Sequence, residues 1–178
     1  MVAVNLSKFD SSMATIKDYF SLLNQPQTFA VDSLSLDGAY KLLMARLHPD
    51  RFVNASALEK RVAEQMSVRI NEAHQTLKND LKRAQYLCTL KGMDVHERRP
   101  MPPAVLMKQM DWHEMLEAAL ATGDSVRMAS LREEVINERA ALLTQLRLAF
   151  DEEKDDAKAL ELTRELMFVE KLLYQIQY

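Results

Sequence analysis

Three consecutive residues, His48, Pro49 and Asp50, stand between two stretches with helical periodicity. Pro49 disfavours helical geometry at His48 and interrupts the backbone hydrogen-bond ladder. We therefore expect an exposed loop in which an imidazole and a carboxylate are available for hydrogen bonds and ion pairs. An ordinary solvated loop histidine is the alternative interpretation of His48.

Other groups that could do chemistry are scattered. His74, His96 and His113 have carboxylate neighbours but no ligand spacing such as i, i+4, so we expect no metal site. Asp111 and Glu114 resemble the rim of a surface more than an acid and base pair, and no glycine-rich phosphate loop or nucleophile elbow is present. We expect neither a cofactor nor enzymatic activity.

The stretches on either side of the tripeptide are the elements that must hold it. Each has one apolar stripe at helical spacing, formed by Leu36, Tyr40, Leu43 and Leu47 before the loop and by Met66, Ile70, Ala73 and Leu77 after it. With Asp18-Tyr19-Phe20 upstream and Lys82-Arg83-Ala84-Gln85-Tyr86-Leu87 downstream, residues 17–91 resemble a J-domain, the module with which co-chaperones engage DnaK-type chaperone ATPases. The resemblance implies an antiparallel helical hairpin that presents the His-Pro-Asp loop.

Composition favours an all-α protein. The 178 residues are 48% hydrophobic and 28% charged, and they include only 3 Gly and 5 Pro. The single cysteine, Cys88, excludes an internal disulfide and points to a reduced, cytoplasmic setting. Residues 1–12 lack the apolar core of a signal peptide, and no stretch approaches the roughly 18 apolar residues of a membrane span.

Charge is shared unevenly along the chain. Residues 1–91 carry 12 Lys and Arg against 9 Asp and Glu, a net +3, whereas residues 92–178 carry 11 against 17, a net −6. This asymmetry predicts different partners for the two halves. Neither half has the concentrated basic patch that nucleic-acid binding requires.

The prolines and glycines suggest where the domains divide. Gly92 is placed to end one helical pattern, and prolines 100, 102 and 103 open the next segment. We predict an N-terminal extension (residues 1–16), a J-domain (17–92), a linker (93–102) and a C-terminal domain (103–178).

Three helical patterns follow the linker, at residues 103–122, 125–150 and 156–177, with an acidic turn at 151–156, and they predict a three-helix bundle. The second has a stripe of Met128, Leu131, Val135, Leu142 and Leu146. The third has a seam of Ala159, Leu162, Leu166, Val169, Leu173 and Ile176.

The first bundle helix has two apolar faces. One should be buried and contains Val105, Trp112, Leu116, Ala119 and Leu120. The other contains Leu106, Met107, Met110, Asp111 and Glu114, and it predicts an adaptable interaction patch with an acidic rim. Phe168 on the last helix extends this patch. Burial of the three apolar residues against another helix of the bundle is the alternative.

A J-domain followed by an acidic three-helix bundle resembles the HscB family, co-chaperones that bring the iron-sulfur scaffold protein IscU to the chaperone HscA. The family's scaffold-binding run corresponds to Leu106-Met107-Lys108-Gln109-Met110-Asp111-Trp112-His113-Glu114, with Phe168 matching a phenylalanine on the last helix. The resemblance also implies that Asp50 pairs with a cationic site of the chaperone and His48 hydrogen-bonds nearby. Lys41, Arg46 and Arg51 would then meet an acidic chaperone surface; an ordinary solvated helix face is their alternative.

The chain departs from the family pattern in two ways. Ala118 stands where the family is often acidic, which thins the rim, and the first sixteen residues precede the usual start. The single cysteine excludes the zinc knuckle that some relatives carry. Two other functions remain open: a J-domain co-chaperone for a different client, and a helical adaptor without chaperone activity.

Overall fold

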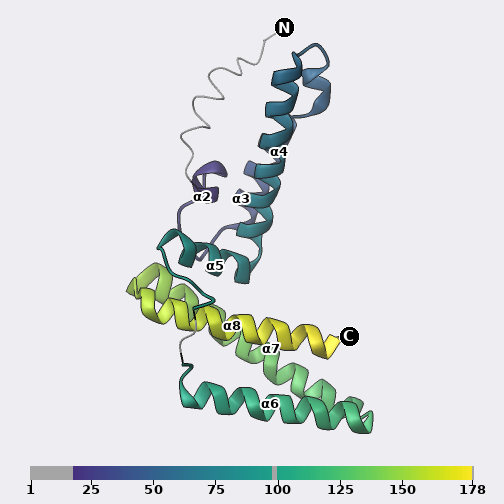
Figure 1. The fold of residues 1–178 in the computed structure, drawn as a ribbon, viewed down its shortest axis with the longest axis vertical. Coiled ribbons are helices and arrows are strands. Elements are labelled where there is room, and N and C mark those ends of the chain that lie inside the picture. Colours follow the sequence, from purple (N-terminus) through teal and green to yellow (C-terminus); the bar gives the residue numbers. More distant parts are fainter. Residues whose placement is uncertain (1–17, 98–99, 178) are drawn as a thin grey trace. The chain divides into compact units, whose positions relative to one another are not determined.

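The computed structural model describes residues 18–97 and 100–177, and every regular element in these ranges is helical (Figure 1). The predicted all-α class is therefore confirmed. The predicted extension, residues 1–16, lies outside the described residues. The chain divides into two compact units between Arg83 and Ala84. No helix in the part of the chain that the structure describes is both long enough and apolar enough to cross a membrane.

The first unit is built on a helical hairpin. Its elements are α2 (Tyr19–Leu22), α3 (Ser33–Arg46), the 3-10 turn η1 (Pro49–Phe52), α4 (Ala57–Lys78) and the beginning of α5 (Asp80–Leu90). Helices α3 and α4 lie side by side, and α2 packs on α4. Asp32 caps α3 by accepting hydrogen bonds from the backbone N–H groups of Leu34 and Ser35.

The apolar stripes expected in this hairpin form its core. Leu36 and Leu47 of the first stripe are buried, whereas Tyr40 and Leu43 are half-buried. Three residues of the second stripe have almost no exposed surface: Ile70, Ala73 and Leu77. Periodicity identified these residues because a helix in a small unit buries one stripe and leaves the remainder in solvent.

Arg83 is a buried cation that ties the base of the hairpin together. Only 7% of its surface is exposed. Its Nε donates to the Phe29 carbonyl at 2.7 Å, its Nη1 to the Leu77 carbonyl at 2.6 Å and its Nη2 to Asp80 Oδ1 at 2.7 Å. The guanidinium also lies over the Phe29 ring. Its donors therefore satisfy backbone carbonyls from two separate segments.

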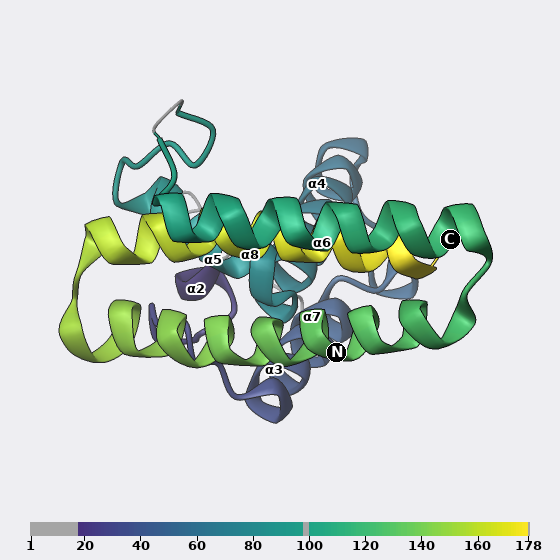
Figure 2. The same cartoon turned by 90° about the horizontal axis from the view of Figure 1, so that it is seen from below.

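The second unit is a three-helix bundle whose chain reverses at each end (Figure 2). It contains α6 (Pro103–Thr122), α7 (Ser125–Arg147), the π-helical turn η2 (Leu148–Glu153) and α8 (Asp156–Gln177). The bounds of α6 coincide with the sequence prediction, because Pro103 suits a first turn and Gly123 closes the helix at φ 64°. The α-helix expected to reach Phe150 instead ends at Arg147, since Ala149 and Phe150 turn into the core within η2.

The bundle core contains most residues of the predicted stripes, but it departs from the prediction near the end of α8. Leu131, Val135, Leu142 and Leu146 of α7 are buried, as are Ala159, Leu162, Leu166 and Val169 of α8. Near the end of α8, however, Leu172 is buried, whereas the predicted Leu173 and Ile176 are half-buried. A straight helix turns every 3.6 residues, so a seam drawn at alternating spacings of three and four loses register over several turns.

The second half of α5 belongs to the bundle unit. Ala84, Leu87 and Cys88 are buried there, and Cys88 Sγ lies 3.7 Å from Thr163 Oγ1 of α8. Burial raises the pKa of the Cys88 thiol. The division between the units thus falls inside α5, and the predicted J-domain and linker ranges remain predictions.

Glu165 is a carboxylate with an unfavourable position in the bundle. Burial, and then the neighbouring charge of Glu138, raises the pKa of Glu165 above its ordinary value of 4.5. Lys108 acts in the opposite direction, but its Nζ is already engaged by Glu138 Oε2 at 2.6 Å. Ionisation of Glu165 therefore destabilises the folded bundle.

Replacing Arg83 by Met should lower the free energy of unfolding of the first unit by about 2–4 kcal/mol, because the Phe29 and Leu77 carbonyls lose their buried donor. Hydrogen exchange of the α4 amides measures this, since the only tryptophan of the chain lies in the other unit. Lys82→Met, at an exposed neighbouring position, is the control. Equal protection in both variants would show that Arg83 does not stabilise the hairpin.

Replacing Glu165 by Gln should stabilise the bundle at pH 7. A raised pKa in the folded state means that stability is lost as pH rises from about 4.5 through the folded pKa, and glutamine removes that loss. Thermal unfolding followed by Trp112 fluorescence should give a higher Tm at pH 7 and a smaller difference at pH 4. Glu117→Gln, an exposed position on α6, is the control; a pH-independent difference would contradict the electrostatic cause.

Candidate functional site

The His48-Pro49-Asp50 loop is an exposed bend between α3 and α4. His48 has extended backbone angles (φ −58°, ψ 134°), and Pro49 opens the short turn η1. The side chains of His48 and Asp50 are 60% and 86% exposed, which confirms the expected exposure of both groups. His48 Nδ1 accepts from the Asp50 backbone N–H at 3.4 Å and lies at the same distance from Asp50 Oδ2. The imidazole and carboxylate are thus held close together on the surface.

The chain leaves this loop through a well-formed helix start. Ser56 and Glu59 make a reciprocal capping box at the first turn of α4, with Ser56 Oγ accepting from the Glu59 N–H at 3.2 Å. Hydrogen bonds from the backbone and then the side chain of Ser56 lower the pKa of Glu59. The capping box therefore fixes where the loop ends and α4 begins.

A polar cluster holds the two helices of the hairpin in register. The Tyr40 ring stacks on His74 with centroids 4.1 Å apart, and its hydroxyl donates to Asn71 Oδ1 at 2.8 Å. His74 Nε2 lies 2.7 Å from Asp37 Oδ1, and Lys78 Nζ lies 2.9 Å from the same oxygen. His74, followed by Lys78, lowers the pKa of Asp37.

From the sequence, His74 is identified only as a possible metal ligand, and this cluster is not predicted. The partners of His74 lie on the other helix: Asp37 is 37 positions away along the chain, and the Tyr40 ring stacks on the imidazole. Within the described ranges, no group of three or more His, Cys, Asp or Glu side chains is arranged to hold a metal ion.

Lys41, Arg46 and Arg51, the cations expected to meet a chaperone, are all exposed. Lys41 and Arg46 lie on α3, and Arg51 lies in η1 directly after Asp50. None of the three forms an ion pair with a described carboxylate. Their charges are therefore available to an acidic surface.

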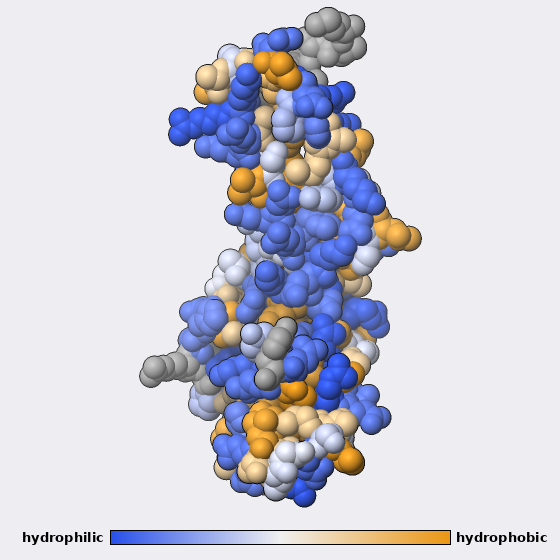
Figure 3. Space-filling view, turned by 90° about the vertical axis from the view of Figure 1, so that its right-hand side faces the viewer, coloured by the Kyte–Doolittle hydropathy of each residue, from blue (hydrophilic) through white to orange (hydrophobic). Residues whose placement is uncertain are grey.

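The second candidate surface lies on α6. Leu106, Met107 and Met110 are 50%, 65% and 54% exposed, which excludes their burial against another helix of the bundle. Asp111 and Glu114 are exposed beside them. Figure 3 shows apolar side chains gathering at the height of α6, the lowest helix in Figure 1.

The opposite face of α6 is buried, with one error in the prediction. Trp112, Leu116 and Ala119 are buried as expected, and Val105 is half-buried. Leu120, expected in the core, is 62% exposed. It lies in the last turn of α6, just before the chain reverses through Gly123.

Phe168 of α8 lies next to α6. Its ring stacks parallel to that of Trp112 at 6.4 Å and meets His113 edge-on at 5.9 Å. Trp112 is fixed in turn, since its Nε1 donates to Glu134 Oε1 at 2.8 Å and Lys108 lies over its ring. The half-buried Phe168 therefore has a defined position that periodicity along one helix did not reveal.

A polar notch of about 370 Å³ adjoins the acidic rim. It is lined by Asp111, Glu114, Met115 and Ala118 of α6 and by Arg127 of α7. The small side chain of Ala118 leaves this space open, and Arg127 places a cation at the position where the rim was expected to thin. The rim is consequently of mixed charge, a property that α6 alone did not predict.

Comparisons with known proteins place the whole chain in context. A family model described as the HSCB C-terminal oligomerisation domain matches residues 101–177. A co-chaperone protein HscB homolog of Bordetella avium is 43% identical over 161 residues, which covers 89% of this chain and 95% of that protein. The corresponding protein of Burkholderia thailandensis is 42% identical over 167 residues, with 92% and 95% covered.

Solved structures give the same picture. Chaperone HscB from Vibrio cholerae matches with a TM-score of 0.77 and 32% identity, covering 90% of this chain and 95% of that one. Human co-chaperone protein HscB matches with a TM-score of 0.84 and 28% identity, covering 92% and 82%. The Jac1 co-chaperone of Saccharomyces cerevisiae, at 21% identity and a TM-score of 0.70, shares the fold.

Proposed function

The chain belongs to the HscB family of co-chaperones, and we propose that it stimulates the ATPase of a DnaK/HscA-type chaperone and delivers the iron-sulfur scaffold protein IscU to it. Such delivery would assist iron-sulfur cluster assembly and transfer. The observation that carries the proposal is the presence in one chain of an exposed His-Pro-Asp loop and an exposed apolar face with a charged rim.

The first unit would contact the chaperone. Asp50 is the more exposed of the two loop side chains and is placed to pair with a cationic site, with His48 hydrogen-bonding beside it. Lys41, Arg46 and Arg51 would meet an acidic surface around that site. Exposed charges of this kind raise the encounter rate and fix the orientation more than they raise affinity.

The bundle would hold the scaffold protein. Leu106, Met107 and Met110 supply apolar area, and Asp111 and Glu114 supply charges at its edge. Phe168 reaches this side of the bundle through its contacts with Trp112 and His113. Methionine side chains adapt to irregular surfaces, which suits a face that must bind and later release a folded client.

In this role the chain does no covalent chemistry. Binding two partners through one chain raises their effective concentration for each other. ATP hydrolysis is then stimulated when the client and the co-chaperone are present together. The J-domain would shift the conformational equilibrium of the chaperone because it binds the chaperone's states with different affinities.

A different client is the second candidate. The observation that favours it is the notch beside Ala118, where Arg127 introduces a positive charge into a rim expected to be acidic. A client with a complementary carboxylate would fit this notch. Titration with the scaffold protein distinguishes the two candidates.

Replacing His48 by Gln should lower the stimulation of a DnaK-type ATPase at least about tenfold, the effect of losing a charge-assisted hydrogen bond of roughly 1.5–3 kcal/mol. Steady-state ATP hydrolysis by the purified chaperone measures it. His96→Gln, at an exposed position of the second unit, is the control. Unchanged stimulation by the His48 variant would reject the J-domain mechanism and leave the adaptor function.

Replacing Leu106, Met107 and Met110 together by Ala should weaken scaffold binding at least about tenfold, because each buried apolar side chain contributes about 1.5–3 kcal/mol at an interface. Titration calorimetry with purified IscU measures the affinity. A matched control is the double variant Leu120→Ala, Val126→Ala, which removes apolar side chains that are 62% and 78% exposed elsewhere on the bundle. Equal affinity in the triple variant and the wild type would favour a different client.

A further inference from the structure

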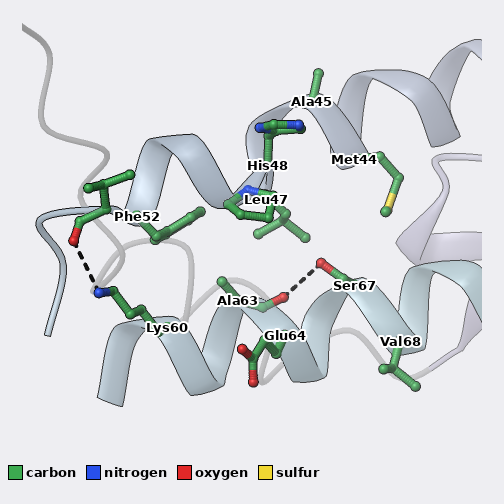
Figure 4. A pocket seen from close by; sticks show the side chains of 12 residues that line it. Met44, Ala45, Leu47, His48, Phe52, Lys60, Ala63, Glu64, Ser67 and Val68 are labelled. Carbon is green, nitrogen blue, oxygen red and sulfur yellow. Dashed lines mark hydrogen bonds between the residues drawn. The ribbon is translucent and has the colours of Figure 1, made fainter. Parts of the chain in front are cut away.

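An apolar hollow of about 720 Å³ lies beside the His-Pro-Asp loop, and the predicted chaperone-binding set does not include it. Its sides are the end of α3 and the turn η1 on one side and α4 on the other (Figure 4). Met44, Leu47 and Phe52 line the first side, and Ala63 and Val68 line the second. Almost all of the hollow therefore presents hydrocarbon to solvent.

Small side chains on α4 keep this hollow open. Ala63 and Ser67 face it, and Ser67 Oγ donates to the Ala63 carbonyl at 2.9 Å, so the hydroxyl is satisfied within its own helix. Two valines stand exposed at the rim: Val53 is 65% exposed and Val68 is 57% exposed. Exposed apolar surface around a concave site is typical of a place where a partner binds.

The rim of the hollow is held in place, and cations slightly outnumber carboxylates around it. Lys60 Nζ donates to the Val53 carbonyl at 3.0 Å, which ties the end of η1 to the first turns of α4. Lys60 and Glu64 both line the hollow, and Arg46 and Arg51 are neighbours in sequence of residues that line it. Asp50 likewise follows Pro49, which lines the hollow, so these three cations stand against two carboxylates, Asp50 and Glu64. The small excess of positive charge favours an occupant with acidic neighbours.

We propose that this hollow receives an apolar side chain of the DnaK-type chaperone, flanked there by acidic residues. The inference rests on the proposed function, because His48 and Pro49 both line the hollow and belong to the loop that would touch the chaperone. A partner that engages the loop lies at the mouth of the hollow. The charged loop residues orient the complex, and the hollow supplies apolar burial next to them.

The hollow would also select among chaperones. A chaperone with an apolar side chain at the matching position gains its burial, whereas one with a polar side chain there must bury an unpaired polar group. Selection would thus depend on Ser67 and Ala63, two small residues with no charge, as well as on the cations of α3.

The proposal is tested by changing the rim without changing the loop. Val68→Ser in the full-length chain should raise the concentration that gives half-maximal stimulation of the chaperone ATPase roughly fivefold, with the maximal rate retained. Leu34→Ser is the matched control, because Leu34 is 84% exposed on α3 and does not line the hollow. The proposal would be overturned if both variants raised this concentration equally, or if Val68→Ser left it unchanged.

Filling the hollow is the complementary experiment. Ser67→Trp should weaken stimulation, whereas Gln75→Trp, at an exposed position further along α4, should not. Circular dichroism establishes that both variants fold, and Val68→Ser maintains the test should the larger side chain at position 67 unfold the hairpin. If the wild type stimulates the chaperone and both Val68→Ser and Ser67→Trp stimulate it equally well, this inference alone is overturned. If the wild type does not stimulate the chaperone, the proposed function is overturned as well.

Two other occupants would give different results. If residues 2–16 of this chain filled the hollow, their deletion would increase stimulation and Val68→Ser would not reduce it. If a second copy filled the hollow, Val68→Ser would lower the molecular mass measured by light scattering. Either result would overturn the assignment to the chaperone.

Discussion

An α-helix packed against its neighbours buries one stripe of its surface, and in this chain the buried stripe decides what remains for a partner. Trp112, Leu116 and Ala119 fix the rotation of α6 in the bundle. That rotation leaves Leu106, Met107 and Met110 in solvent beside their acidic neighbours. The candidate client surface is thus a consequence of core packing, because no turn of α6 about its axis could expose other residues without unpacking Trp112.

The two helices of the first unit's hairpin also bury one stripe each, and a loop containing Pro49 interrupts the helical geometry between them. Pro49 ends helical geometry after α3, and the Ser56 and Glu59 capping box begins α4 a few residues later. Between these two points Phe52 is buried, whereas the side chains of His48 and Asp50 stay largely exposed. Polar ties between α3 and α4, from Asp37 to His74 and from Tyr40 to Asn71, join the two helices at the end of the hairpin away from the loop.

Charge and apolar area are combined differently in the two candidate surfaces. On α6 an apolar centre has a rim in which carboxylates are joined by Arg127. Beside the His-Pro-Asp loop an apolar hollow has both Lys60 and Glu64 in its lining. Each surface offers non-directional burial at its centre and orienting charges at its edge, an arrangement that gives specificity without very high affinity. A co-chaperone that must release both partners needs that balance.

The sequence by itself determined the helical class, the bounds of α6, the exposure of the His-Pro-Asp loop and the free apolar face of α6. These features depend on periodicity and on the local geometry of proline and glycine, which act over a few residues. The domain ranges and the roles of the site residues remain predictions.

Tertiary structure decided the rest. The stack of Phe168 on Trp112, the burial of Arg83 against the Phe29 carbonyl, the exposure of Leu120 and the hollow above Ser67 all depend on residues far apart along the chain. Phe29 and Arg83, for example, are 54 positions apart. Periodicity describes which way a side chain points from its own helix, and only the packing of several helices determines what that side chain meets.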